Sequence, residues 1–314
     1  MEKIEIKDMY KYLNQEIDTY LLVTKKELKE GKNDRYIRLN FADKTGNISG
    51  NIWNNALSMM DGYSEHDVVK IRAAVNSFKE QTQLNIKKIR KAEPNEYEMS
   101  DFIQTTKKEV NVMIDELFDF INSINDEFIK KLLLSIFEDK ETLLKFSSCP
   151  AAKNWHHNYV GGLLEHTISV VKICDFASKE YPVNRDILVA GAIVHDFGKI
   201  FEYTSPPILD FTDSGRLIGH LILGDEFITK KANEINLFPP NTLMKLRHLI
   251  ASHHGEMEKG AVKVPQTIEA IVLHFADNLD AQTMGVHQLI EAANDPNARW
   301  TEYDKLNNRY IYLG

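Results

Sequence analysis

Histidines and aspartates recur in five apolar segments of the C-terminal two thirds of the chain. The segments read GGLLEHTISVV, AIVHDFGK, RLIGHLILG, LIASHHGE and LHFADNLDA. They contain six candidate metal ligands: His166, His195, Asp196, His220, His253 and Asp277. Imidazole nitrogens and carboxylate oxygens are common ligands of divalent cations in proteins. The pattern therefore predicts a metal site, provided that the folded chain brings these side chains together.

Helical periodicity places candidate ligands on inward faces. His166 lies three positions after Leu163 and four before Val170. Asp277 lies four positions after Leu273. Residues three or four apart share one face of a helix, so both side chains should point toward the apolar core.

Two further histidines follow the same pattern. We expect His220 to share a helix face with Leu217 and Gly224, and His253 to follow Leu249. A single inward histidine is most often a core residue bonded to a backbone carbonyl. Polar groups buried from five helices would each need a separate partner, whereas one cluster of cations satisfies all of them. The metal-site interpretation is therefore favoured.

The ligand set indicates which cations are expected. Six ligands are enough for two ions if Asp196 bridges them, and two ions ~3.5–4 Å apart clamp both oxygens of a phosphoryl transfer. Four imidazoles and two carboxylates suit Mn²⁺ or iron, and also Co²⁺ or Ni²⁺. Mg²⁺, which prefers oxygen ligands, is a further alternative.

The elements that must position these residues differ between the two parts of the chain. From about Ser100 to 293, apolar residues repeat every three or four positions, which predicts helices. The first ninety residues contain five β-branched and aromatic runs separated by turns, with a hairpin expected at Lys44-Thr45-Gly46. We predict an α+β multidomain fold: an OB-type β-barrel at 1–93 and an all-α helical bundle at 94–314. A small β-sandwich would give similar local signals for the first part.

The charge distribution favours a polyanion partner for the first part. The net charge is −8, but residues 1–93 hold 17 Lys and Arg against 14 Asp and Glu, while the remainder holds 21 against 32. In OB-type barrels, basic and aromatic side chains bind single-stranded nucleic acid by charge and stacking. The candidates for contact with single-stranded RNA or DNA are Tyr36, Arg38, Trp53, Arg72, Phe78 and Lys87. Taken alone, each aromatic is more typical of a core.

The remaining composition indicates a cytoplasmic protein without a membrane partner. The apolar run at 187–194 is far shorter than the roughly 18 residues of a membrane span. Cys149 and Cys174 have neither metal-ligand nor redox spacing, which is typical of a reducing compartment. The start MEKIEIKDMYKYL lacks an apolar segment followed by a cleavage site, so we expect no signal peptide. A homo-oligomer is compatible with the sequence, which carries no direct sign of one.

Together, these segments resemble a known family. One His segment, HDFGK, two further His segments and a late Asp, in this order, are similar to the HD-domain metal-dependent phosphohydrolases. The segments CPAAKNWHHNYVGGLLEHT, GRLIGH, ASHHG and HFADNLDA, placed after an OB-type domain, more closely resemble the YhaM-type 3′–5′ exoribonucleases. The resemblance implies an α-helical HD fold and metal-dependent removal of nucleotides from a 3′ end, with Mn²⁺ as the expected ion.

The resemblance also implies a reaction and roles for residues in it. A water activated by two ions would attack the terminal phosphodiester in line and release a nucleoside 5′-monophosphate. Asp196 would bridge the ions, and Gly198 would leave room near them. Lys199 would meet a phosphate oxygen as a point charge, unless it is an ordinary solvated lysine. His254 would donate to the phosphate or to the leaving oxygen, unless it replaces His253 as the ligand.

Further polar residues of the same segments have expected roles. His156 and His157, before the glycine pair, would orient substrate or serve as helix-capping or core residues. Asp280 would fix a histidine tautomer rather than bind an ion. His274 and His287 are expected to be structural or surface residues.

Two other functions fit the same sequence. An HD phosphohydrolase with the same ions could act on a small nucleotide or a cyclic dinucleotide, but such an enzyme has no need of a basic strand face. A pure single-strand binding protein with an inactive helical part is the other alternative. This alternative is disfavoured because the chain has a His or Asp at all six positions that are expected to bind metal. The sequence does not separate RNA from single-stranded DNA.

Overall fold

The computed structural model describes residues 4–31, 34–53, 57–78, 81–153, 155–205, 209–293, 298–304 and 308–314. The chain divides into two units, Met1–Gln104 and Thr105–Gly314. The division lies after two short 3-10 turns, η3 (Pro94–Glu96) and η4 (Met99–Asp101). Among the described helices, none is long and apolar enough to cross a membrane.

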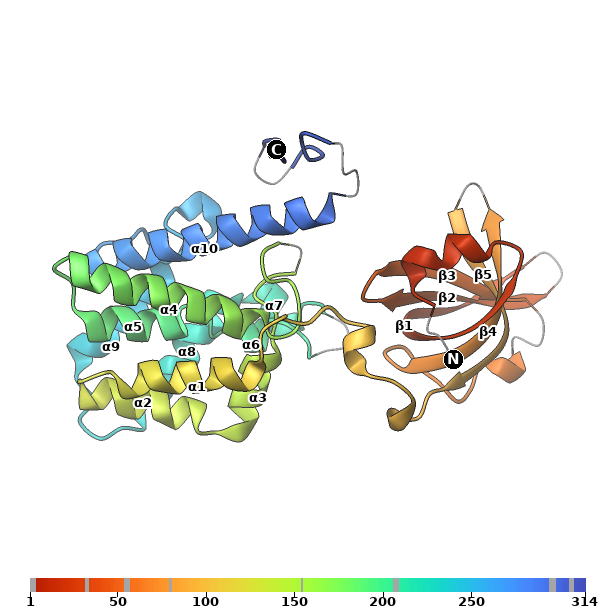
Figure 1. Ribbon diagram of the computed structural model, residues 1–314. Coiled ribbons are helices and arrows are strands. Elements are labelled where there is room, and N and C mark those ends of the chain that lie inside the picture. Colours follow the sequence, from red (N-terminus) through yellow and green to blue (C-terminus); the bar gives the residue numbers. More distant parts are fainter. Residues whose placement is uncertain are drawn as a thin grey trace. The chain divides into compact units, whose positions relative to one another are not determined.

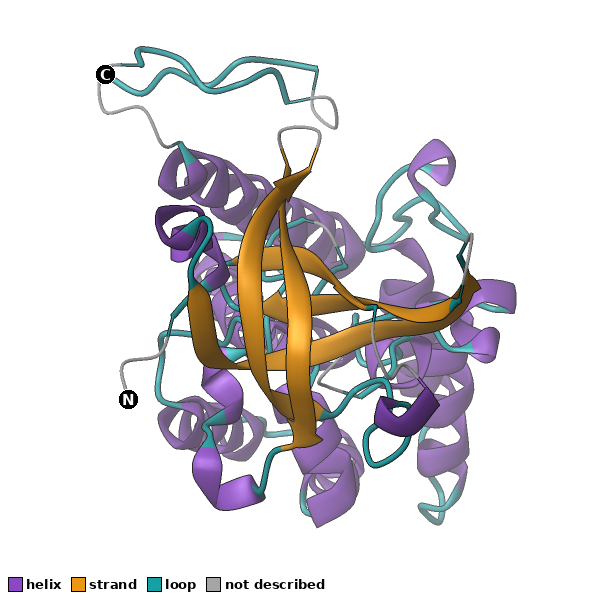
Figure 2. Cartoon of the chain, turned by 90° about the vertical axis from the view of Figure 1, so that its right-hand side faces the viewer, coloured by secondary structure: helices purple, strands orange, loops and turns teal. Residues whose placement is uncertain are grey.

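The first unit is a closed barrel of five strands (Figures 1 and 2). The strands are β1 (Glu16–Glu30), β2 (Arg35–Asp43), β3 (Gly46–Ile52), β4 (Val68–Phe78) and β5 (Gln81–Lys91). Their order around the barrel is β1-β2-β3-β5-β4, and β4 returns to pair with β1. All pairs are antiparallel except β3 with β5. Two 3-10 elements accompany the barrel, η1 (Ile6–Tyr12) and η2 (Leu57–Met59).

Alternation of apolar and polar residues produces the barrel interior. On β2, Ile37, Leu39 and Phe41 are fully buried, while Arg38 between them is exposed. Residues two apart on a strand share a face, so one side of each strand fills the interior. The β2–β3 hairpin turns at the predicted Lys44-Thr45-Gly46.

The second unit is a bundle of helices (Figure 1). The helices are α1 (Val110–Asn122), α2 (Glu127–Phe137), α3 (Lys140–Ser148), α4 (Gly162–Glu180), α5 (Arg185–Val194), α6 (Lys199–Glu202), α7 (Asp213–Leu217), α8 (His220–Asn233), α9 (Pro240–Ser252) and α10 (Ile268–Ala292), with the 3-10 turn η5 (Met257–Lys259) before α10. The α+β fold with an N-terminal barrel and a helical C-terminal part is therefore confirmed.

Helix α5 lies at the centre of the bundle. Every residue from Ile187 to Val194 is buried, and the helix packs against α4, α9 and α10. Gly191 permits the close approach of α9, because a Cβ at this position would overlap the side chain of Leu249. The apolar run is thus a buried helix that ends at Val194, directly before His195 and Asp196.

Candidate metal centre

The helical unit brings the six candidate ligands to one place. His166 lies in the second turn of α4, and Asp277 lies within α10. His195 and His253 directly follow the last residues of α5 and α9, and His220 is the first residue of α8. His166, His195, Asp196 and His253 are buried, while His220 and Asp277 are half-buried.

One sequence-based expectation about His220 is wrong. Leu217 does not share a helix face with it, because α7 ends at Leu217 and α8 begins at His220. Gly219 between the two helices has a φ of 80°, and Leu217 is 85% exposed. The inward direction of His220 comes from its place at the start of α8 rather than from a continuous apolar stripe.

Two histidines are oriented by the end of their own helix. Nδ1 of His195 donates to the Ala192 carbonyl at 2.8 Å, and Nδ1 of His253 donates to the Ile250 carbonyl at 2.9 Å. A carbonyl oxygen only accepts, so the proton of each neutral ring lies on Nδ1. In the neutral form of each ring, Nε2 therefore carries the lone pair that can bind a cation.

The other two histidines are oriented by carboxylates. Nδ1 of His220 lies 3.1 Å from Oε1 of Glu202, and Nδ1 of His166 lies 2.7 Å from Oδ2 of Asp280. Burial raises the pKa of both carboxyl groups, but their histidine partners outweigh it and hold both below the usual range. With these partners on Nδ1, the Nε2 atoms of all four imidazoles face the centre. For His166, burial lowers the pKa, but Asp277 and Asp280 outweigh it and raise that pKa to about 9, so a cation would have to displace a proton from this ring.

The two oxygens of Asp196 face two different pairs of these nitrogens. Oδ2 lies 3.6 Å from Nε2 of His166 and 3.4 Å from Nε2 of His195. Oδ1 lies 3.5 Å from Nε2 of His220 and 3.4 Å from Nε2 of His253. One carboxylate thus lies between two groups of potential ligands.

Each group is completed by one further side chain. Oδ1 of Asp277 lies 3.2 Å from Nε2 of His166 and 3.9 Å from Nε2 of His195, so these three residues form the first group. His254 joins Asp196, His220 and His253 in the second. Within each group the ligand atoms lie within 4.8 Å of one another.

The site contains polar atoms that need a cation. Oδ1 of Asp196, Nε2 of His220, Nε2 of His253 and Nδ1 of His254 are buried, with no hydrogen-bond partner among the described residues. In the first group, the Nε2 atoms of His166 and His195 lie only 3.2 Å apart. Buried polar groups without partners are costly, and divalent ions satisfy all of these atoms together. The residues present therefore fit a divalent metal centre.

Lys199 is a buried member of this site rather than a solvated lysine. It is 7% exposed, and its Nζ lies 2.5 Å from Oδ2 of Asp196. Burial lowers the pKa of Lys199, but Asp196 outweighs it and raises that pKa above its ordinary value. The ammonium group therefore places a fixed positive charge beside the carboxylate oxygen that faces His166 and His195.

Gly198 does not leave room near the ligands, contrary to the expectation from sequence. The space that its side chain would fill is occupied by the backbone of α8, at the His220 carbonyl and the Gly224 amide. The glycine is required because α6 and α8 approach backbone to backbone.

A polar cavity of about 200 Å³ opens onto the ligands. His156 and His254 line it together with Asp196, Lys199 and Asn278. Burial lowers the pKa of His156 to about 2 and that of His254 to about 3, so both rings are neutral near pH 7. His156 Nδ1 is buried and has no partner among the described residues. The cavity therefore presents neutral hydrogen-bonding groups beside the ligands, together with two ammonium groups, those of Lys199 and Lys259.

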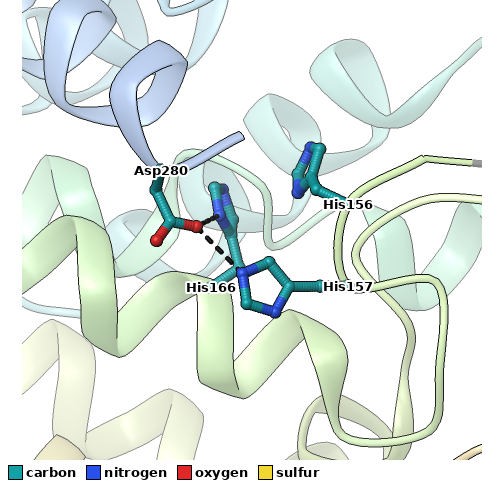
Figure 3. Close-up of side chains that lie close together, drawn as sticks. All are labelled: His156, His157, His166 and Asp280. Atoms are coloured by element: carbon teal, nitrogen blue, oxygen red, sulfur yellow. Dashed lines mark hydrogen bonds and ion pairs between the residues drawn. The ribbon is translucent and has the colours of Figure 1, made fainter. Parts of the chain in front are cut away.

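The structure separates the remaining histidines by position. His157 Nε2 lies 3.0 Å from Oδ2 of Asp280, beside His166 and His156 (Figure 3). His274 Nδ1 donates to the carbonyl of His253 at 2.7 Å and thereby supports that residue. His287 is exposed, at 3.6 Å from Glu291 and outside both ligand groups.

On the barrel, the predicted contact residues fall into two sets. The rings of Tyr36 and Trp53 stack at 4.5 Å between centroids, and Trp53 is 49% exposed. Arg38 is exposed two positions after Tyr36, on the same face of β2.

The other predicted basic residues already have acidic partners. Arg72 is bonded to Asp18 at 3.1 Å, and Lys87 forms an ion pair with Glu16. Phe78, the last residue of β4, is 61% exposed. The stacked Tyr36–Trp53 pair with Arg38 is therefore the better-formed contact surface.

Sequence reasoning missed two kinds of residue at this site. Glu202, which orients His220, lies three positions after Lys199, and that helical spacing was its available signal. Glu165 and Tyr159 precede His166 in the chain and are hydrogen-bonded to each other at 3.0 Å. Neither carries a local pattern that distinguishes it from a surface residue.

Comparisons with known proteins cover both units. Residues 163–282 match the HD domain family, and this range contains all six candidate ligands. The chain is 30% identical over 305 residues to the 3′-5′ exoribonuclease YhaM of Geobacillus sp., covering 96% of this chain and 92% of that protein. It is 31% identical to the 3′-5′ exoribonuclease YhaM of Bacillus subtilis, covering 96% and 95%.

The barrel has a weaker match among solved structures. The second OB-fold domain of replication protein A from Methanococcus maripaludis aligns with 29% of this chain and 96% of its own, at 17% identity and a TM-score of 0.25. The OB-type assignment rests on the strand order β1-β2-β3-β5-β4 of the closed barrel. With an OB-type barrel, an HD domain and relatives that match along nearly their whole length, the chain belongs to the YhaM family of 3′–5′ exoribonucleases.

Proposed function

We propose that this protein is a metal-dependent 3′–5′ exonuclease that removes nucleoside 5′-monophosphates from single-stranded RNA, with single-stranded DNA as the second candidate substrate. The observation that carries the proposal is the position of Asp196, whose two oxygens face two pairs of histidine Nε2 atoms at 3.4–3.6 Å. The relatives named 3′-5′ exoribonuclease, which match 96% of this chain, support the direction and the RNA substrate.

Two cation positions follow from the two ligand groups. His166, His195 and Asp277 would hold one ion, and His220 and His253 the other, with Asp196 shared between them. His254 is a further candidate ligand of the second ion. The nitrogen-rich set favours a transition metal over Mg²⁺, and we propose Mn²⁺ as the ion. When bound, such ions supply charge neutralisation at phosphorus and activation of a water.

The protein's own groups would hold the substrate beside this centre. Lys199 lines the cavity beside Asp196 and would pair with a phosphate oxygen as a point charge. His254 and His156 are neutral rings that line the same cavity, so each can donate one N–H to a phosphate or ribose oxygen. His157 contacts Asp280 instead, which favours a supporting role over substrate contact.

The barrel would bind the strand that leads to the site. The stacked Tyr36 and Trp53 rings offer an exposed aromatic surface for bases, and Arg38 offers a charge for the backbone. Arg72 and Lys87 would contribute less, because Asp18 and Glu16 already neutralise them. The exposed Tyr36–Trp53 stack beside Arg38 favours an oligonucleotide substrate over a small nucleotide or cyclic dinucleotide. We also propose a cytoplasmic place of action, since both cysteines are free and buried.

The proposal is tested with labelled single strands of RNA and DNA in the presence of Mn²⁺, Co²⁺, Ni²⁺, Mg²⁺ or Fe²⁺. A 3′ label should be released at once as a mononucleotide, while a 5′ label should give a descending ladder. Asp196→Ala serves as the inactive control. Release of the 5′ label first, or an intact strand with every metal, would refute the assignment.

A small phosphodiester separates the alternative substrate class. Trp53→Ala combined with Tyr36→Ala should slow RNA degradation while leaving hydrolysis of bis-p-nitrophenyl phosphate unchanged. Equal loss on both substrates would count against a strand-binding role for the barrel.

A further inference from the structure

A line of hydrogen bonds begins at the metal-binding candidate His166 and leads away from the cavity. Oδ2 of Asp280 accepts from Nδ1 of His166 at 2.7 Å and from Nε2 of His157 at 3.0 Å (Figure 3). Nδ1 of His157 lies 2.8 Å from the hydroxyl of Tyr159. His157 is 1% exposed and Asp280 is 7% exposed, so water hardly competes for these contacts.

The line ends at the first residues of the helical unit. Oε2 of Glu165 accepts from the Tyr159 hydroxyl at 3.0 Å and from the Thr106 hydroxyl at 2.6 Å. Oε1 of the same carboxylate lies 3.2 Å from Nζ of Lys108. Thr106 and Lys108 directly follow the point where the chain leaves the first unit. We refer to Thr106, Lys108, Glu165, Tyr159, His157 and Asp280 as the anchoring network.

The chemistry of the two ends fixes the direction of the bonds between them. Both ends are acidic side chains, Asp280 and Glu165, and each accepts hydrogen bonds from two neighbours. Carboxylates only accept, so the three contacts from Asp280 through His157 and Tyr159 to Glu165 need three hydrogens. Nε2 of His157 therefore donates to Asp280, and the Tyr159 hydroxyl donates to Glu165.

The backbone is shaped to permit the network. His157 has a φ of 51°, a left-handed conformation that is uncommon for a residue with a side chain. A Cβ on Gly162 would overlap the His157 carbonyl, which accepts from the amide of Ala151 at 3.0 Å. A Cβ on Gly161 would lie 2.7 Å from Cγ2 of Thr106. The glycine pair thus admits His157 on one side and the incoming chain on the other.

We propose that the anchoring network positions His166 for metal binding, and that its outer end makes metal affinity depend on the segment that joins the two units. Asp280 holds the proton on Nδ1 of His166 and fixes the ring plane, so Nε2 points at the centre. His157, Tyr159 and Glu165 in turn hold Asp280. Thr106 and Lys108 complete the network only when residues 105–108 lie in their native place. This inference rests on the metal centre of the proposed function.

The test measures Mn²⁺ binding to the full chain by isothermal titration, without RNA. Tyr159→Phe and Glu165→Gln should each weaken Mn²⁺ binding by about 10-fold or more, the range for groups that orient a metal ligand. Thr106→Val should weaken it in the same direction by a smaller factor. The matched control is Tyr181→Phe, which removes a hydroxyl from the exposed C-cap residue of α4, the helix that contains Glu165. This control should bind Mn²⁺ like the wild type.

Thermal unfolding of the metal-free proteins separates positioning from stability. A lower unfolding temperature with unchanged Mn²⁺ affinity would overturn the proposal and leave the network a structural one. If Tyr159→Phe does not fold, Thr106→Val decides, because it removes only one donor at the outer end. In the double variant Tyr159→Phe with Thr106→Val, the fold-loss of Mn²⁺ affinity should be smaller than the product of the two single fold-losses. A fold-loss equal to that product would show that the two residues act independently, which would contradict a shared network. Wild-type protein that binds no Mn²⁺ would refute the metal centre itself.

Discussion

The close approach of α6 to α8 gives a direct way to disturb one ligand group and spare the other. In Gly198→Ala, the new Cβ would lie 1.9 Å from the His220 carbonyl oxygen and 2.7 Å from the Gly224 amide nitrogen. Both atoms belong to the backbone, so a rotamer change cannot relieve the overlap. Since Cβ atoms essentially never lie within 3.0 Å of such atoms, α6 and the start of α8 must separate by about 1.1 Å.

The separation has two calculable effects. Overpacking of a close contact costs ~1–3 kcal/mol of unfolding free energy. At ~2–4 °C per kcal/mol for a unit of this size, the unfolding temperature should fall by about 2–12 °C. Coordination distances tolerate only about ±0.2 Å, so a displacement of about 1 Å removes His220 as a ligand. The second cation should then bind at least ~10-fold more weakly, while the group of His166, His195 and Asp277 keeps its geometry.

Isothermal titration with Mn²⁺ and a thermal melt check both effects on the same protein. Wild-type chain should bind two ions, and Gly198→Ala should retain one at wild-type affinity. Gly46→Ala is the matched control, because its Cβ would meet only Cγ2 of Ile6 at an ordinary 3.6 Å. Two tightly bound ions in Gly198→Ala with an unchanged melt would refute the reasoning.

Four further predictions follow from the site and the barrel. Asp196→Ala should abolish binding of both ions, since each group uses one of its oxygens; titration that still shows one tight ion would contradict the shared role. Removal of metal with EDTA should lower the unfolding temperature, and Mn²⁺ at 100 times its Kd should restore about 2.7 kcal/mol, whereas an unchanged melt would argue against a bound ion. Trp53→Ala should weaken binding of single-stranded RNA by ~1–3 kcal/mol in a fluorescence anisotropy assay, with Phe176→Ala as the exposed aromatic control. The hydrogen bond with Arg90 lowers the pKa of the Glu96 carboxyl to about 2. The ion pair should therefore stabilise the folded state fully above pH 4.5, and this stabilisation should be lost as the pH falls through about 2. An NMR titration midpoint of Glu96 near 4.5 would contradict this.

The sequence is most informative where potential metal ligands occur at the spacing of a helix face or where apolar residues alternate as in a strand. Histidines and aspartates at helical spacing from apolar residues indicated the six side chains that the helical unit brings together. Alternation in segments such as RYIRLNFAD was enough to predict the strands and, with the turns, the barrel. These signals are local, because a side chain's face is determined by a few neighbours along the chain.

The remaining features depend on contacts between distant elements. Glu202 orients His220 across eighteen positions of chain, and Asp280 orients His166 from another helix. A glycine after His195-Asp196 suggests free space for ions, but the neighbour of Gly198 is the backbone of α8. Leu217 was placed on the wrong helix because the break at Gly219 interrupts an apparently regular stripe. Periodicity along one segment contains no information about which other segment packs against it.

The two histidines that follow α5 and α9 differ from the other two in what holds them. His195 and His253 each take their Nδ1 acceptor from three residues earlier in their own helix, whereas His166 and His220 rely on partners from elsewhere in the fold. The orientation of His195 and His253 therefore depends only on the backbone of one helix each, whereas that of His166 and His220 also depends on α10 and α6 keeping their places.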